Sequence, residues 1–309
     1  MKGLTLSEAY YDTVGKEMIA AQFGMYRNRI AAGLVGLGSE CFGFDDELSR
    51  DHDWGPGFCL WLDQNDFNHI GASLQKAYDA LPDRFLGFRR IKSDWGMGRV
   101  GVISIGGFYA SFIGSPQAPE SLNKWITIPE ANLAACTNGK VFEDPLGDFS
   151  AIRRHIKAYY PEDVRLKKIA AKCMAAAQSG QYNFARSLQR KAFFPAMRAL
   201  AAFCEDALSL VFLLHRQYMP FYKWACKAAE TLPMPGPKIA KAVENLSHED
   251  RSRSRVEVIE EICASIIEEL LRQGLSDSKS DFLLEHGPSV HSRIQNRELK
   301  QLDMWWGGN

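Results

Sequence analysis

Residues 36–56 read Gly-Leu-Gly-Ser-Glu-Cys-Phe-Gly-Phe-Asp-Asp-Glu-Leu-Ser-Arg-Asp-His-Asp-Trp-Gly-Pro and lie between two apolar runs, 30–37 and 58–62. Short apolar runs bounded by Gly and Pro are typical of buried strands. The stretch therefore predicts a strand, a tight loop, a turn or short helix, and a second strand. It places the carboxylates of Asp51 and Asp53 at the start of the second strand.

The spacing of Asp51 and Asp53 suggests a metal site. Side chains two residues apart on a strand point to the same face, so these carboxylates would project together and His52 would point away. Two carboxylates on one face repel each other unless a cation lies between them. Oxygen ligands of this kind suit Mg²⁺, which usually takes one or two protein carboxylates and phosphate oxygens.

Gly38 and Ser39 are candidates for binding phosphate. Glycine leaves the backbone free to approach a ligand closely, and the loop offers backbone N–H donors together with the Ser39 hydroxyl. The sequence therefore places a phosphate-binding loop eleven residues before the acidic pair.

The order of these features resembles the nucleotidyltransferase superfamily related to DNA polymerase beta. Its signature is a Gly-Ser loop followed by a Ser-x-Asp-x-Asp-like element, matched here by 49–53. The extended form over 51–56 also resembles bacterial proteins with the domain DUF4037, over most of the chain. The resemblance implies transfer of a nucleoside monophosphate from an NTP, ATP foremost, to an acceptor hydroxyl, with pyrophosphate released. Two Mg²⁺ ions would be held by Asp51 and Asp53, and the phosphates by Gly38 and Ser39.

The superfamily normally needs a third carboxylate from a later strand, either to take the proton of the attacking hydroxyl or to hold the second metal ion. The apolar run 100–105 predicts such a strand but carries no acid. Glu130 and Asp144 are the two leading substitutes. Other possibilities are Asp45, Asp46 and Glu120, or no third acid at all.

The fold expected is α+β in two domains. Residues 1–148 combine helices over 4–31, with a break near Gly24 as an alternative, and over 67–81 with strands over 58–62, 100–105 and 140–142. They form a mixed sheet with flanking helices. Strand patterns end near residue 149, so 149–309 is expected to be an all-α bundle, with helices that include one over 181–213 interrupted at Pro195 and one over 289–305.

The helical half carries two clusters of cations and aromatics, 181–191 and 218–224. Arg and Lys on helices are usually solvated and the aromatics usually belong to the core, which is the ordinary structural interpretation. In nucleotidyltransferases of the aminoglycoside-modifying kind, a helical domain closes over the cleft and supplies cations to the triphosphate. The resemblance thus makes Lys223 the first candidate, followed by Arg186 and Arg190.

Composition narrows the class of protein. The chain has 309 residues and a formal charge of zero, so we expect no strong non-specific binding to nucleic acid and no attraction to membranes. Seven cysteines occur without a Cys-x-x-Cys pair, which favours reduced thiols in a cytoplasmic protein over disulfides or zinc. No apolar stretch approaches membrane-spanning length, and the histidines show no metal-type spacing.

Alternative functions remain at this point. The acceptor is expected to be a small molecule, with a tRNA or a protein as other possibilities. A second enzyme hypothesis is a toxin-like transferase that modifies tRNA or protein. A hypothesis of another class is a catalytically weakened nucleotide-binding or regulatory protein, which the missing acid in 100–105 favours.

Overall fold

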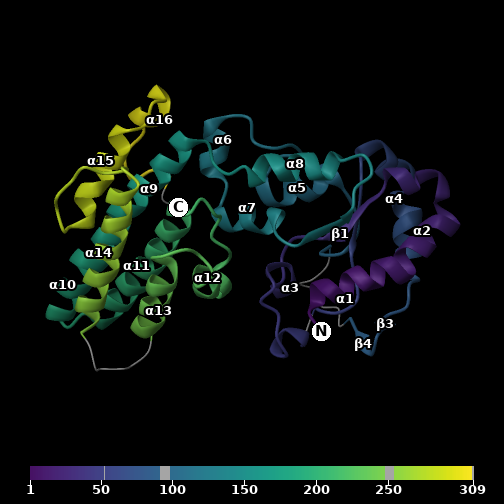
Figure 1. The fold of residues 1–309 in the computed structure, drawn as a ribbon, viewed down its shortest axis with the longest axis horizontal. Coiled ribbons are helices and arrows are strands. Elements are labelled where there is room, and N and C mark those ends of the chain that lie inside the picture. The colour runs from purple at the N-terminus through teal and green to yellow at the C-terminus, as the bar shows by residue number, and fades with distance from the viewer. Residues whose placement is uncertain (52, 91–97, 248–253, 308–309) are drawn as a thin grey trace. The chain divides into compact units, whose positions relative to one another are not determined.

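The computed structural model describes residues 1–51, 53–90, 98–247 and 254–307. The chain forms two compact units (Figure 1). Unit 1 consists of Met1–Pro119 and Asn132–Ala158, and unit 2 of Glu120–Ala131 and Tyr159–Asn309. The chain therefore passes between the units at 119/120, 131/132 and 158/159.

A four-stranded mixed sheet organises unit 1. Its strands are β1 (Ala31–Leu34), β2 (Cys59–Leu62), β5 (Gly101–Ser104) and β6 (Lys140–Glu143), in the order β5-β2-β1-β6. β1 is antiparallel to both β2 and β6, whereas β2 and β5 are parallel. The predicted α+β class is confirmed, and the expected strands are all present, although β1 ends three residues before the apolar run 30–37 does.

Alternation along β2 gives the sheet two apolar faces. Leu60 and Leu62 point into a core that also contains side chains from the N-terminal helices and from α4 (Gln64–Asp79). Trp61 points to the opposite face, where its ring stacks on Phe149 of α8 (Asp148–Lys157) with 3.8 Å between centroids. Helices therefore cover both faces, which explains why β2 is buried at every position.

The N-terminal helix is shorter than predicted. It comprises α1 (Gly3–Tyr10), a π-helical turn (Tyr11–Gly15) and α2 (Lys16–Gln22). The break considered near Gly24 is confirmed, because Phe23 leaves the helical conformation and Gly24–Arg29 forms a 3₁₀ helix, whereas a continuous α-helix to residue 31 is wrong. This tighter turn leads directly into β1.

The remaining elements of unit 1 are short. Asp63 caps α4 by accepting hydrogen bonds from the backbone N–H groups of Asn65 and Asp66, so this helix begins three residues before the predicted start. The others are α3 (Ser39–Phe42), a 3₁₀ turn (Leu48–Arg50), β3 (Arg84–Phe85), β4 (Phe88–Arg89), α5 (Ile105–Ile113) and most of α7 (Glu130–Thr137).

The regular elements of unit 2 are all helices in the parts of it that the structure describes. α9 (Glu162–Ala176) lies at its centre and packs against α11 (Phe193–Leu214) and α15 (His286–Ser292) (Figure 1). The other elements are α6 (Leu122–Thr127), a π-helical segment (Ala177–Phe184), α10 (Ala185–Gln189), α12 (Tyr222–Ala229), α13 (Gly236–Ser247), α14 (Arg255–Arg272), a 3₁₀ turn (Leu283–Glu285) and α16 (Arg297–Gln301).

Two expectations about these helices are wrong in detail. The break expected at Pro195 occurs instead at residues 190–192, because proline is tolerated in the first turn of α11. The single helix expected over 289–305 is replaced by α15 and α16, with Asn296 capping the second.

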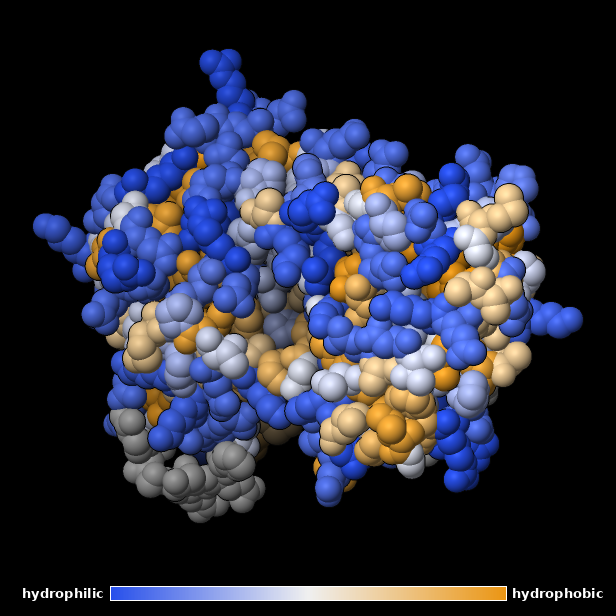
Figure 2. All heavy atoms as spheres, turned by 45° about the vertical axis from the view of Figure 1, so that its right-hand side comes forward, coloured by the Kyte–Doolittle hydropathy of each residue, from blue (hydrophilic) through white to orange (hydrophobic). Residues whose placement is uncertain are grey.

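The surface is mixed. Figure 2 shows hydrophobic side chains scattered among hydrophilic ones over the face that it displays. Among the described residues, no helix combines the length and the apolar character that crossing a membrane requires. Five of the seven cysteine thiols are buried and none is paired in a disulfide.

The contact between β1 and β6 gives a stability prediction. Gly139 has a φ of +59°, and a Cβ there would overlap the carbonyl oxygen of Leu34. Gly114 has a similar φ of +69° but open space around it. Gly139→Ala should lower the free energy of unfolding by about 3 kcal/mol and Gly114→Ala by only about 1 kcal/mol, as measured by urea denaturation. Equal losses would show that backbone conformation alone, without crowding, sets the requirement for glycine.

Candidate functional site

One edge of the unit 1 sheet collects the loops that the sequence singled out. β1 runs toward Gly36–Ser39, and β2, its antiparallel neighbour, starts at the same edge. β5 is parallel to β2, so the residues that precede it, including Arg99, also lie there. We refer to this end of the sheet, with 36–40, 51–56 and Arg99, as the loop edge.

Side chains from other segments surround the Gly36–Ser39 loop and hold its backbone in place. Asn138 forms two hydrogen bonds with Gly36: its Oδ1 accepts from the backbone N–H at 2.9 Å and its Nδ2 donates to the carbonyl at 2.8 Å. Gly38 has a φ of +139°, and a Cβ there would overlap Arg99 Nη2 and the Glu40 carboxylate. Only glycine fits this position, because its φ is positive and the Arg99 and Glu40 side chains fill the space that a Cβ would need.

Arg99 connects the Gly-Ser loop with the acidic loop. Its Nη2 donates to Glu40 Oε1 at 2.9 Å, and its Nη1 donates to the carbonyl oxygen of Asp53 at 3.4 Å. The side chains of Arg99 and Glu40 are 20% and 5% exposed. A pair so far removed from water is costly to break, because either charge alone would remain desolvated.

Arg90 holds the other side of the acidic loop. Its guanidinium donates to the carbonyl oxygens of Pro56 and Gly55, both at 3.0 Å, and to that of Asp53 at 3.4 Å. Two arginines therefore donate to the carbonyl oxygens of this loop, and the Asp side chains take no part in those bonds. The loop edge, with Arg90 beside it, thus combines the carboxylates of Glu40, Asp51 and Asp53 with two guanidinium groups.

The backbone at Asp51 and Asp53 differs from the expectation. Asp51 follows the 3₁₀ turn with helical φ and ψ, Asp53 has a φ of +53°, and β2 starts only at Cys59. The prediction that strand alternation points both carboxylates to one face is therefore wrong. Asp51 is exposed and Asp53 is 7% exposed, and His52 lies outside the described residues.

Asp45 and Asp46 have structural roles. Asp45 Oδ2 accepts from the backbone N–H of Gly3 at 2.7 Å and from Trp54 Nε1 at 3.1 Å, which ties the N-terminus to the acidic loop. Asp46 accepts from the backbone N–H and the hydroxyl of Ser49. Both carboxylates are used to shape the loop.

Asp144 does not lie at the loop edge. In the register of β6, Lys140 pairs with Leu34 and Glu143 with Ala32, so Asp144 lies beyond the opposite end of the sheet. Its carboxylate accepts the backbone N–H groups of Gly147 and Ser150 and shapes the turn before α8. The structure thus does not bring Asp144 together with Asp51 and Asp53.

Glu130 and Glu120 belong to unit 2. Glu130 Oε2 accepts from the Ser209 hydroxyl at 3.0 Å, while Oε1 is buried without a hydrogen-bond partner. Burial raises the pKa of the Glu130 carboxyl, and the nearby ammonium groups of Lys168 and Lys172 oppose this increase. Among the described residues, no group of three His, Cys, Asp or Glu side chains is placed to hold a metal ion.

The three cations predicted for the triphosphate all lie on the surface of unit 2. Arg186 stacks over the ring of Tyr182 at 4.8 Å, Arg190 follows the last residue of α10, and Lys223 lies in the first turn of α12 beside exposed Tyr222. They are accessible, as a phosphate contact would require, but belong to different elements.

Sequence reasoning missed Arg99, Arg90 and Glu40. The segment 84–99 showed no clear periodicity, so its arginines could not be assigned to a site. A signal existed for Arg99, because a cation just before the strand that pairs with β2 lies at the edge where β2 begins. Reading that signal needs the strand order, which the sequence does not state.

The family comparison concerns the middle of the chain. The model of the family described as Domain of unknown function (DUF4037) matches residues 125–225. The expected resemblance to DUF4037 is therefore confirmed over that range, which includes parts of both units. Residues 36–56, from which the resemblance was first drawn, lie outside it.

The structural comparison gives a distant neighbour. A crystal structure of a nucleotidyltransferase-like protein from Exiguobacterium sibiricum is similar at 11% identity and a TM-score of 0.36, covering 92% of this chain and 88% of that one. No curated protein matches the chain. A likeness of this size does not define a reaction.

The buried pair at the loop edge can be tested by stability. Glu40→Gln keeps the shape of the side chain but removes its charge, leaving the Arg99 guanidinium without its counterion. We expect a loss of about 2 kcal/mol in the free energy of unfolding, measured by urea denaturation. Glu8→Gln, which breaks the more exposed pair with Lys140, is the control and should cost less than about 0.5 kcal/mol. Equal effects would mean that burial does not strengthen the Glu40 pair.

Proposed function

We propose that this protein is a Mg²⁺-dependent nucleotidyltransferase that moves a nucleoside monophosphate from an NTP, ATP foremost, to an acceptor hydroxyl and releases pyrophosphate. The observation that supports this most strongly is the meeting of Gly36–Ser39 and the Asp51–Asp53 loop at one edge of the sheet, joined by Arg99. This is the arrangement that the sequence resemblance implies.

The loop edge offers suitable groups for a triphosphate. Gly38 and Ser39 provide a backbone without a Cβ barrier, and the Arg99 guanidinium lies directly beside Gly38. Guanidinium groups recognise phosphate oxygens through paired hydrogen bonds. Arg99 is partly exposed, so a phosphate can approach it while it keeps its bond to Glu40.

The donor set fits Mg²⁺ in kind. Asp51 and Asp53 supply hard carboxylate oxygens, and phosphate oxygens would complete the shell. When bound, the ion would neutralise charge on the phosphates and so favour departure of pyrophosphate. Asp53 would be the better positioned ligand, because two arginines fix its backbone.

A nucleotide-binding protein without transferase activity is the second candidate. It is favoured because the described residues include no cluster of three metal-ligating side chains and because Asp144 lies at the far end of the sheet. Such a protein would use the same loop edge to bind nucleotide but would lack the group that takes the acceptor's proton.

The acceptor is part of the proposal. We propose a small molecule, in keeping with the zero formal charge, which gives no general attraction for tRNA. A toxin-like reaction on tRNA or protein uses the same nucleotide chemistry and differs only in the acceptor. We also propose a cytoplasmic location, since the seven cysteines are unpaired.

Activity can be tested with the full chain, labelled NTPs, Mg²⁺ and cell extract as the source of acceptor. Pyrophosphate release should require Mg²⁺. Asp51→Asn and Asp53→Asn should each reduce pyrophosphate release at least about a hundredfold. Replacing a residue that only hydrogen-bonds to a metal ligand already lowers metal affinity or activity about ten- to a hundredfold.

The matched control is Asp12→Asn, which removes an exposed carboxylate paired only with Lys16 on the N-terminal helix and should leave activity unchanged. Nucleotide binding by the parent protein without any pyrophosphate release would favour the second candidate. If EDTA and the Asp51→Asn/Asp53→Asn double substitution both leave nucleotide affinity unchanged, the metal assignment is wrong.

A further inference from the structure

Unit 2 contains a cavity of about 170 Å³ that the proposed reaction does not use. Its walls come from the start of α7, from α9 and α11, and from segments that follow them. The lining residues are Pro129, Glu130, Ala131, Lys168, Lys172, Glu205, Ser209, Leu213, Met219 and Gly307. All of them belong to unit 2.

α9 carries three buried cations close together in sequence, and they differ in their hydrogen-bond acceptors. Arg165 donates to the carbonyl of Leu213 and to Gln273 Oε1, both at 2.8 Å. Lys167 donates to the carbonyls of Leu302 and Asp303. Lys168 is only 4% exposed, yet it forms no hydrogen bond or ion pair with any residue that the structure describes.

The environment of Lys168 is the cavity and one aromatic ring. Its Nζ lies 5.5 Å from the centroid of Tyr160, a cation–π contact that leaves its hydrogen-bond donors unused. Burial lowers the pKa of this ammonium group, and the Glu130 carboxylate opposes the decrease. Although the Lys168 side chain is buried, its Nζ keeps contact with the open space of the cavity, so an anion that enters the cavity could accept hydrogen bonds from it.

Glu130 presents the opposite charge to the same cavity. Its Oε1 is buried without a partner, although Oε2 accepts from Ser209. Lys172, which also lines the cavity, is already paired with Asp206 at 2.7 Å. The cavity therefore offers the Lys168 ammonium group and Glu130 Oε1 without a direct ion pair between them, and the exposed carboxylate of Glu205 also lines it.

Leu213, Met219 and Ala131 add apolar side chains to the lining. A cavity of about 150 Å³ in another protein holds benzene, so this one suits a ligand of roughly six to nine non-hydrogen atoms. A ligand that fits must be small, carry both charges and have an apolar part.

From this placement we propose that the cavity binds a small α-amino acid with an apolar side chain. Its carboxylate would accept from Lys168, its ammonium group would donate to Glu130 Oε1, and its side chain would lie against Leu213 and Met219. Binding would then give each buried group the partner that the chain does not supply. The proposal is independent of nucleotidyl transfer, since none of these residues belongs to unit 1.

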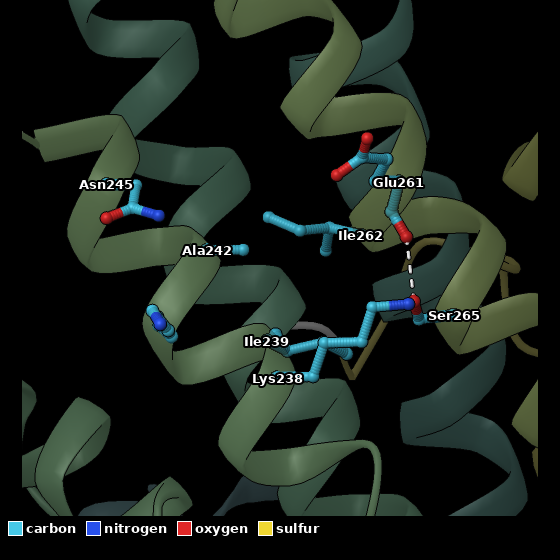
Figure 3. Close-up of a pocket in the computed structure, with 8 residues that line it drawn as sticks. Lys238, Ile239, Ala242, Asn245, Glu261, Ile262 and Ser265 are labelled. Carbon is cyan, nitrogen blue, oxygen red and sulfur yellow. Dashed lines mark hydrogen bonds between the residues drawn. The ribbon is translucent and has the colours of Figure 1, made fainter. Parts of the chain in front are cut away.

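A second cavity in unit 2 does not have this arrangement of buried charged groups. Side chains of α13 and α14 line about 150 Å³ there, and Ser265 donates to the carbonyl of Glu261 at 2.8 Å (Figure 3). The charged lining residues Lys238, Lys241 and Glu261 are exposed. Water can form hydrogen bonds with these charged groups, so they do not need a ligand as a partner.

The test is calorimetric titration of the full chain with L-valine and L-alanine. The controls are isobutylamine and isobutyrate, which each carry one of the two charges, and inorganic phosphate. We expect saturable binding of at least one amino acid and at least tenfold weaker binding of the single-charge compounds. Glu130→Gln and Lys168→Met should each weaken binding at least tenfold, whereas Lys238→Met in the second cavity should not change it.

Absence of amino-acid binding would overturn the proposal, as would equal binding of isobutyrate or tighter binding of phosphate, which would define a simple anion site. Unchanged affinity in both cavity variants would place the ligand elsewhere. Circular dichroism and urea denaturation show whether each variant folds. If neither variant folds, the affinities of the parent protein for valine, isobutylamine and isobutyrate still test the proposal.

Discussion

The ion pair between Arg99 and Glu40 is the constraint on which the loop edge depends. Both side chains are largely removed from water, so each needs the other. Their contact fixes the distance between the Gly-Ser loop and the strand β5 that follows Arg99. It also leaves no room for a side chain at residue 38, so the need for glycine there follows from the pair.

The same guanidinium extends this constraint to the acidic loop. Arg99 and Arg90 together donate to three carbonyl oxygens of 53–56, and this holds Asp53 in a left-handed conformation that a residue with a Cβ adopts at a cost. Asp45 adds a third link through Trp54 and Gly3. A loop with little regular structure is thus rigid because its polar backbone groups are satisfied by side chains.

Local pattern was enough to predict the strands, because β1, β2 and β5 are short apolar runs between glycines and polar turns. It was also enough to single out 36–56. It could not predict the backbone at Asp53, which depends on arginines 37 and 46 residues away in the chain. Nor could it place Asp144, since the register of β6 against β1, and not proximity in sequence, decides which end of the sheet that carboxylate occupies.

Glu130 illustrates why a carboxylate cannot be assigned from its position in the sequence alone. It follows β5 and precedes β6, yet the chain leaves unit 1 at residue 120 and returns only at residue 132. In unit 2 it meets Ser209 and the helix that carries Lys168. α9 buries three cations in four residues, and carbonyl or amide oxygens of other segments accept from two of them. All three side chains are buried, so the one without an acceptor marks where the folded chain leaves a charge to be matched from outside.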